Sequence, residues 1–232
     1  MKIQPINQNY NQNRTLKNNN RTNNRPAFGA ILKNNLPKVV KTNSEGLLEK
    51  VVCVISAPSG TGKDTLVKGF NEKYNFFEEI ITCTTRQPRP GEVNGKNYHF
   101  LSPDDFKKQI QEGEFLEYEN VYGDTFYGTR RKDVNKALEK GKNAVLIIDV
   151  NGAKKIKEMR PNTVSLFITP PSMQELERRL TSRGTETADK IQQRLARAEY
   201  ELAQKDNFDI ILQNDNISES VEEMAQIFKI NA

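Results

Sequence analysis

The triplet Lys63-Asp64-Thr65 has the residue types and the position expected of a phosphate-binding site. It follows a loop of small residues with glycines at Gly60 and Gly62, and this loop follows the apolar run 51–55. Backbone N–H groups in such a loop, and at the start of the next helix, attract phosphate oxygens. The lysine adds a charge for the β- and γ-phosphates. The predicted phosphate loop comprises Ala57, Pro58, Ser59, Gly60, Thr61, Gly62, Lys63, Asp64 and Thr65. The alternative is a strand, turn and helix with incidental glycines.

The loop departs from the pattern G-x-x-x-x-G-K-[ST] at two positions. Ala57 replaces the first glycine, and Asp64 replaces the hydroxyl residue that usually meets Mg²⁺. A carboxylate is a hard Mg²⁺ ligand, but it also brings negative charge close to phosphate oxygens. Thr65 offers a hydroxyl one residue later. We therefore expect a metal contact from Asp64 or Thr65.

Two further groups of residues suit a polyanionic ligand. Arg86 and Arg89 lie in a proline-stiffened loop just before Glu92, and guanidinium groups pair well with phosphate oxygens. The alternative for them is a pair of solvated loop charges. Asp149 ends the buried run 144–149, where it faces the ligand crevice of an open α/β sheet. Its alternative role is a helix N-cap.

Residues 175–201 contain five arginines and predict a lid of two helices around the turn 183–187. They are Arg178, Arg179, Arg183, Arg194 and Arg197. A basic helix pair beside a phosphate loop suits a lid that closes over a triphosphate. The alternative is a helix hairpin with ordinary salt bridges. The lone histidine, His99, lies between aromatic residues and is interpreted as structural.

Apolar runs that alternate with helical patterns predict an α/β fold with a parallel sheet covered on both faces. The expected strands are 51–55, 77–85, 144–149, 163–168 and 209–212. The stretch 93–128 is rich in short β-like and aromatic segments, and predicts a small lobe inserted between core strands.

The basic charge of the 232-residue chain is concentrated at its N-terminal end. The net charge is +5, yet residues 1–46 alone carry eight basic residues and one acid. This segment is rich in asparagine and poor in apolar residues, so we expect it to be disordered. Since the remainder is nearly neutral, nucleic-acid binding is not expected except through this basic tail. A targeting peptide is another interpretation of the tail.

The two cysteines, Cys53 and Cys83, both lie in apolar runs. Small buried thiols of this kind fit a reducing cytoplasm. No apolar run approaches the length that a membrane span requires, and no secretory signal follows Met1. The sequence therefore predicts a cytoplasmic protein without a membrane partner, and leaves its oligomeric state open.

From about residue 47 to 232 the chain closely resembles the guanylate kinase family, the P-loop enzymes that phosphorylate GMP with ATP. The matching stretches include SAPSGTGKDT, TCTTRQPRPGEVNGKNYHF, GEFLEYENVYGDTFYGT and AVLIIDVNGA. The resemblance implies a P-loop kinase fold with a GMP-binding lobe at about 83–129 and a lid at about 179–197. It also implies ATP and GMP as partners and Mg²⁺ as the cofactor.

Residue by residue, the resemblance assigns three groups of side chains. Those assigned to GMP are Thr82, Arg86, Arg89, Glu92, Tyr98, Glu117, Tyr127, Thr129 and Asp149. Those assigned to ATP are the phosphate loop 57–65 and Asn214, which would lie near the adenine. Those assigned to the transferred phosphoryl group are Lys63, Arg179, Arg183 and Arg194. Glu117 would accept hydrogen bonds from the ring N–H and the exocyclic amine of guanine.

The chain departs from the family pattern at Asp64, at Ile147 and in the loop 123–127. The family commonly has an acid at the position of Ile147, and the loop is one residue longer than usual. Asp64 also resembles the related ribose bisphosphate kinases of the same fold, but the guanine-side residues Thr82, Glu117 and Thr129 are present together in this chain. Scaffold modules that have lost catalysis are a second alternative; they typically lack an intact phosphate loop and lid.

Overall fold

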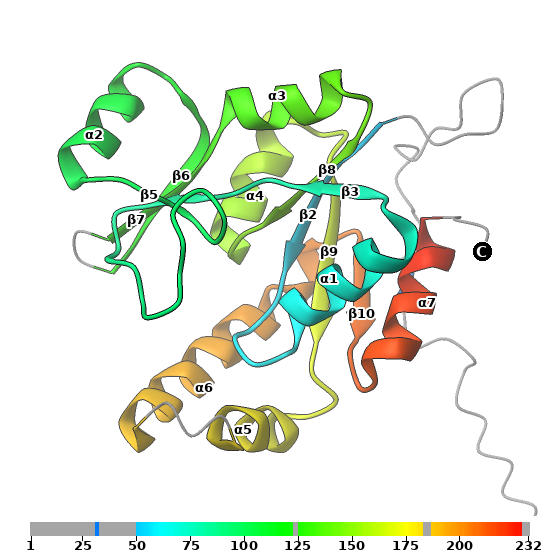
Figure 1. The fold of residues 1–232 in the computed structure, drawn as a ribbon. Coiled ribbons are helices and arrows are strands. Elements are labelled where there is room, and N and C mark those ends of the chain that lie inside the picture. The colour runs from blue at the N-terminus through cyan, green and yellow to red at the C-terminus, as the bar shows by residue number, and fades with distance from the viewer. Residues whose placement is uncertain (1–30, 33–49, 123–124, 183–186, 229–232) are drawn as a thin grey trace, which may run out of the picture.

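The central sheet of the computed structural model has six strands in the order β1-β10-β9-β2-β8-β3 (Figure 1). The structure describes residues 31–32, 50–122, 125–182 and 187–228. The strands are β1 (Ile31–Leu32), β2 (Val52–Ser56), β3 (Phe77–Glu79), β8 (Asn143–Ile147), β9 (Val164–Thr169) and β10 (Ile210–Gln213). All pairs are parallel except β1 with β10. The predicted parallel α/β sheet is confirmed.

Helices cover both faces of this sheet, because the buried strands alternate their apolar side chains. From β2, Cys53 and Ile55 face α1 (Lys63–Tyr74) and α7 (Ile217–Ile227). Val52 and Val54 face the opposite side, where α3 (Arg131–Glu139) and α4 (Val150–Met159) pack. Both cysteines are buried free thiols. Within the described residues, no helix is long and apolar enough to cross a membrane.

The predicted strand 77–85 is wrong as a single element. Phe77–Glu79 forms β3 at the edge of the core sheet, whereas Cys83–Thr84 forms β4 in a second sheet. Between them, the amide of Ile80 still bonds to the carbonyl of Val145, and the chain then leaves the core. A continuous β-branched run in the sequence therefore bridges two sheets.

The second sheet forms the lobe expected from the sequence and has the order β5-β4-β7-β6. Its strands are β4, β5 (His99–Phe100), β6 (Phe115–Tyr122) and β7 (Thr125–Arg130), and α2 (Pro103–Gln111) packs on them. Cys83, Phe106 and Phe115 form its own small core. Because this core is separate from the two that flank the central sheet, the lobe is a distinct packing unit.

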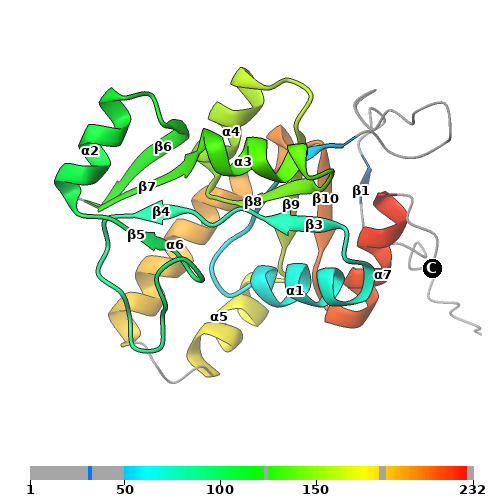
Figure 2. The same cartoon turned by 45° about the horizontal axis from the view of Figure 1, so that its top comes forward.

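Two helices, α5 (Met173–Ser182) and α6 (Ala188–Ala203), form the expected lid. Leu176 and Leu180 of α5 pack against Ile191 and Ala198 of α6. Figures 1 and 2 show that the lobe and these helices extend from the same side of the core, with the loop between β2 and α1 near their base. A short 3₁₀ helix, η1 (Lys205–Asn207), leads from α6 to β10.

Most of the segment 1–46 lies outside the described residues, so its predicted disorder is untested. The exception is Ile31–Leu32, which pairs with Ile211 and Ile210 along the edge of β10. This strand was not anticipated from the sequence, because two apolar residues in an asparagine-rich segment carry no strand signal of their own.

Candidate active site

The loop between β2 and α1 is built as a phosphate cradle. Gly62 precedes α1 in the left-handed conformation, with φ 86°, and no side chain caps the helix. The amides of the first helical turn are therefore available to an anion. The hydroxyl and the amide of Thr61 both donate to the carbonyl of Pro58, at 2.9 and 3.3 Å, so the loop braces itself.

Gly60 and Gly62 are required by the shape of the loop. Both have positive φ, and a Cβ on Gly60 would approach Leu180 Cδ2 of the lid to 2.9 Å. A Cβ on Gly62 would approach Asn214 Nδ2 to 2.8 Å. The loop therefore fits closely between the lid helix α5 and the segment that follows β10.

We expect Gly62→Ala to destabilise the protein. The new Cβ meets the buried Asn214 amide in a backbone conformation that costs about 1–3 kcal/mol for a residue with a side chain. Urea unfolding should show this loss, whereas Gly113→Ala should cost only its backbone strain, since no atom lies within 4 Å of a Cβ there. Equal stability of the two variants would contradict the packing argument.

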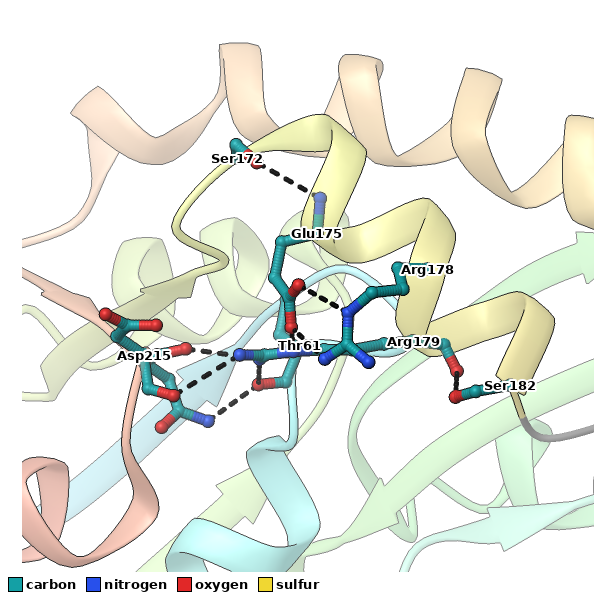
Figure 3. Close-up of polar contacts among 8 residues, drawn as sticks. Thr61, Ser172, Glu175, Arg178, Arg179, Ser182 and Asp215 are labelled. Carbon is teal, nitrogen blue, oxygen red and sulfur yellow. Dashed lines mark hydrogen bonds and ion pairs between the residues drawn. The ribbon is translucent and has the colours of Figure 1, made fainter.

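Arg179 is not among the cavity-lining residues in this structure, and its predicted role toward the transferred phosphoryl group stays a prediction. Its Nη1 donates to the carbonyls of Thr61 and Asn214, at 3.3 and 3.2 Å, and its Nη2 donates to the Asp215 carbonyl (Figure 3). Glu175 accepts from its Nε at 2.8 Å. Glu175, whose pKa is lowered to about 2 by Arg178 and Arg179, therefore holds the guanidinium behind the loop.

Asn214 also supports the loop from behind. Its side chain is buried, donates to the Thr61 carbonyl at 2.7 Å and accepts from Ser220 Oγ. Both polar ends of the Asn214 amide are thus occupied by the protein. Any effect of Asn214 on the binding of adenine would therefore act through the phosphate loop. Arg183, predicted to meet the transferred phosphoryl group, lies outside the described residues.

The lobe gathers the predicted phosphate-side residues around Tyr98. The guanidinium of Arg86 lies 5.4 Å from the Tyr98 ring and is held by Glu92 at 2.8 Å. Glu92 also accepts from the Arg89 amide at 2.7 Å, so one carboxylate fixes both arginine positions. Tyr127 pairs edge-on with Tyr98, and these tyrosines and Arg89 line the cavity.

The predicted residues Tyr127 and Thr129 lie on β7, opposite Glu119 and Glu117 of β6. Residues 123–124 lie outside the described part, but the flanking register shows a bulge between Asn120 and Tyr122. Beyond the bulge, Glu117 pairs directly with Thr129. The register also shifts between Phe115 and Glu117, so the β6–β7 pairing is irregular on both sides of the Glu117–Thr129 pair.

Glu117 is a buried carboxyl group on β6, where the lobe lines the cavity. It is 6% exposed and accepts from the Thr129 hydroxyl at 2.7 Å. Burial raises its pKa to about 7, and the charge of Asp149 contributes further. Gly152 in α4 permits this position, because a Cβ there would lie 3.1 Å from Glu117 Oε2. The carboxyl group is therefore preorganised and sensitive to pH.

Asp149 is the helix N-cap that the sequence offered as its alternative role, and its predicted role toward a ligand stays a prediction. Its Oδ1 accepts from the amides of Asn151 and Gly152, at 2.7 and 3.1 Å, so it caps α4. It also lines the cavity beside Ile147 and Thr82. The helix cap fixes the carboxylate at the carboxyl end of β8, where ligands meet open α/β sheets. His99 is not among the cavity-lining residues.

One cavity of about 1130 Å³ joins the phosphate loop, the lobe and the lid. All nine predicted loop residues line it, and Lys63 and Arg194 reach it from opposite sides. The Arg194 guanidinium contacts Ser59 Oγ of the loop. Three lid residues lining the cavity were not selected from the sequence: Lys190, Gln193 and Glu201, and Arg197, named there only as one of the lid arginines, lines it with them. Their spacing of three or four residues was the available signal for one shared helix face.

The donor set beside Lys63 fits Mg²⁺. The Asp64 carboxylate is exposed at the start of α1, 3.3 Å from Lys63 Nζ, and Thr65 follows it. Mg²⁺ prefers hard oxygen ligands and is usually held by one or two protein groups together with substrate phosphates and water. Among the described residues, no cluster of three or more metal-binding side chains occurs.

A parallel sheet with a phosphate loop after β2, a separate acceptor lobe and a basic lid defines a P-loop kinase of the nucleoside monophosphate type. The model of the guanylate kinase family matches residues 49–231. The chain belongs to this family.

Individual relatives agree with this assignment. The chain is 44% identical over 177 residues to guanylate kinase of Clostridium perfringens strain 13, covering 76% of this chain and 82% of the relative. It is 45% identical to guanylate kinase of Caldanaerobacter subterraneus, covering 76% and 85%. The crystal structure of guanylate kinase from Anaplasma phagocytophilum superposes with a TM-score of 0.63 and 31% identity, covering 82% of this chain and 87% of that one.

Proposed function

We propose that the protein transfers the γ-phosphoryl group of ATP to GMP, forming ADP and GDP. The observation that carries this proposal is one cavity that joins the phosphate loop to Glu117, whose carboxylate accepts a hydrogen bond from Thr129. The loop suits a triphosphate, and the buried carboxylate suits the ring N–H and amine of guanine. Adenine offers an acceptor at that ring position and lacks the amine, so it would leave the carboxylate unmatched.

The chemistry requires alignment and positive charge more than covalent participation by the protein. A phosphate oxygen of GMP forms a bond to the γ-phosphorus of ATP. The bond between the γ-phosphorus and the oxygen that bridges it to the β-phosphate breaks. The electron pair of that bond stays on the bridging oxygen, and ADP leaves. Arg86, Arg89, Tyr98 and Tyr127 hold the GMP phosphate, and Lys63 and Arg194 offset charge on the transferred group. Closure of the lid excludes water, which protects ATP from hydrolysis.

Mg²⁺ would be held by Asp64 or Thr65 together with the ATP phosphates. Bound there, it neutralises charge on the β- and γ-phosphates. The Asp64 carboxylate then has a cation to compensate its own charge. We also propose a cytoplasmic site of action, which the two buried free thiols favour.

The first experiment measures ADP release from ATP and Mg²⁺ with GMP, AMP and ribose 1,5-bisphosphate offered separately. Turnover with GMP alone is the expected result. Turnover with the sugar phosphate would favour the ribose bisphosphate kinases of the same fold. Absence of turnover in a folded protein that binds GMP would identify a binding module without catalysis.

Gly152→Ala should weaken the binding of GMP without affecting the binding of ATP. The new Cβ would crowd Glu117 Oε2 at 3.1 Å, and Thr129 prevents the carboxylate from moving freely. A displacement of this kind should raise the KM for GMP about tenfold, the effect of one weakened polar contact. Steady-state kinetics with each nucleotide varied will measure this, with Gly69→Ala on α1 as the control, where a Cβ meets only Val221 at 3.6 Å. An unchanged KM for GMP would show that Glu117 does not depend on this close approach.

A further inference from the structure

The helix α6 presents one polar face to the cavity. Lys190, Gln193, Arg194, Arg197 and Glu201 all line it, and their spacing places them on one side of the helix. Arg194 contacts Ser59 of the phosphate loop. Arg197 lies three residues further along α6, which corresponds to about 4.5 Å of helix rise.

This direction along α6 leads toward the acceptor side of the cavity. Tyr200 lies three residues after Arg197, and its hydroxyl donates to Asn151 Oδ1 at 3.2 Å. Asn151 lies in the first turn of α4, directly after the cavity-lining Asp149. Arg197 is therefore placed between the phosphate loop and the residues expected to hold GMP.

The guanidinium of Arg197 is held in a defined position. Its Nε donates to Glu201 Oε1 at 3.0 Å, and its Cζ lies 4.9 Å from the Tyr200 ring centre. Among the described residues this is the one hydrogen bond of the guanidinium, and it leaves the donors of its two terminal nitrogens unused. The Glu201 side chain is only 12% exposed.

Glu201 is an unusual group for a cavity that binds polyanions. Burial raises the pKa of Glu201, and the charge of Asp149 raises it further. Arg197 and Lys63 lower it. A carboxylate here would repel phosphate unless its charge is matched. Arg197 supplies that match, and its remaining donors stay available for a ligand.

We propose that Arg197 is a further phosphate-binding residue of the transfer reaction, and that Glu201 is the residue that positions it. Its terminal nitrogens contact the phosphoryl group as it passes between ATP and GMP. The inference rests on the proposed guanylate kinase function. A planar guanidinium suits this role, since it binds the carboxylate through one N–H and phosphate oxygens through the others.

The test compares Arg197→Ala and Arg197→Gln with the wild-type protein in the coupled ADP assay. Removing one charge-stabilising donor at a transition state typically costs about 10²-fold in kcat, so we expect a loss of about 10- to 100-fold with smaller changes in either KM. Gln still donates to Glu201 but carries no charge. If Arg197 only satisfied Glu201, Arg197→Gln would retain wild-type kcat, and this result would overturn the proposal.

Two more variants separate positioning from folding. Glu201→Gln should lower kcat by a similar factor, and its effect should not add to that of Arg197→Ala in the double variant, because both act through one guanidinium. Arg178→Ala is the matched control, since this lid arginine is 69% exposed and pairs with Glu175. Its kcat should be unchanged.

The wild-type protein distinguishes the two levels of inference. If it does not phosphorylate GMP, the proposed function fails. If it does, and Arg197→Ala keeps kcat within about twofold, a change too small for a lost charge-assisted contact, only the role of Arg197 fails. Thermal unfolding of each variant identifies losses that are due to misfolding.

Discussion

Lys63→Ala should lower kcat by about 10³-fold, the scale expected when a preorganised charge at a transition state is removed. Lys63 is the first residue of α1, and its side chain lines the cavity at 21% exposure. Its partner in this structure is Asp64, 3.3 Å away, which itself faces the cavity. The Lys63 ammonium group would therefore contact the phosphates of ATP at the point where the loop amides converge.

Binding of GMP should survive in the same variant, because the acceptor residues lie on the lobe and on α4. Isothermal titration with GMP should give an affinity close to that of the wild type. Lys68→Ala provides the control on the same helix, since Lys68 is 76% exposed and pairs with Glu72. Near-full activity of Lys63→Ala would show that the catalytic assignment is wrong.

The phosphate loop was predictable from the sequence because its signals are local. A β-branched run, small residues and a lysine at a helix start form one continuous stretch, and its geometry depends on backbone conformation. Asp149 was predictable for the same reason, since it directly follows a buried strand. The GMP-side residues were assigned by family resemblance, and Glu92 and Thr129 now have contacts that explain their presence.

The features that were missed depend on contacts between distant segments. Residues 77–85 form one continuous strand-like stretch, and only the pairing partners divide it between two sheets. Arg179 and Arg194 are both lid arginines, yet the orientation of α5 directs Arg179 behind the loop. Gly152 matters because Glu117, 35 residues earlier in the chain, packs against it. No local sequence pattern predicts such a close contact between distant segments.

The affinity for GMP should increase with pH up to about pH 7, because the pKa of Glu117 is raised to about 7. Only the ionised carboxylate can accept both guanine N–H groups. One unit below that pKa about a tenth of the molecules are ionised, so the KM for GMP should be about tenfold higher there than at pH 8. Asp149 and Glu119 raise this pKa further, whereas Lys155 and the Thr129 hydroxyl oppose them.

The same shift acts on stability with a definite sign. The native state holds the Glu117 proton more tightly than the unfolded chain, whose pKa is near 4.5. Glu117 therefore contributes stability at low pH and loses it as the pH rises from about 4.5 through about 7, by up to about 3 kcal/mol. Urea unfolding of the nucleotide-free protein should show this decline, and Glu117→Gln should lack it.

Glu117→Gln should lower kcat/KM for GMP by about 10³- to 10⁴-fold, since a site built to pair with a polar edge is strongly affected when one partner changes. The amide keeps the volume and can still accept from Thr129, but its NH₂ group opposes a guanine donor. The KM for ATP should change by less than about threefold, because ATP contacts the loop instead. Glu78→Gln is the control, because Glu78 lies on β3 in the core sheet, pairs with Lys140 and is not among the cavity-lining residues.

The two Glu117 predictions check one another. The second ionisation of the GMP phosphate also falls near pH 6, so it would produce part of the pH dependence on its own. Glu117→Gln retains the phosphate ionisation and lacks the carboxyl ionisation, so the ratio of the two KM profiles isolates Glu117. Inosine monophosphate, which has the ring N–H and lacks the exocyclic amine, should be a poorer acceptor for the wild type than GMP. Equal losses for GMP and ATP in Glu117→Gln would mean that Glu117 supports the fold and does not read the base.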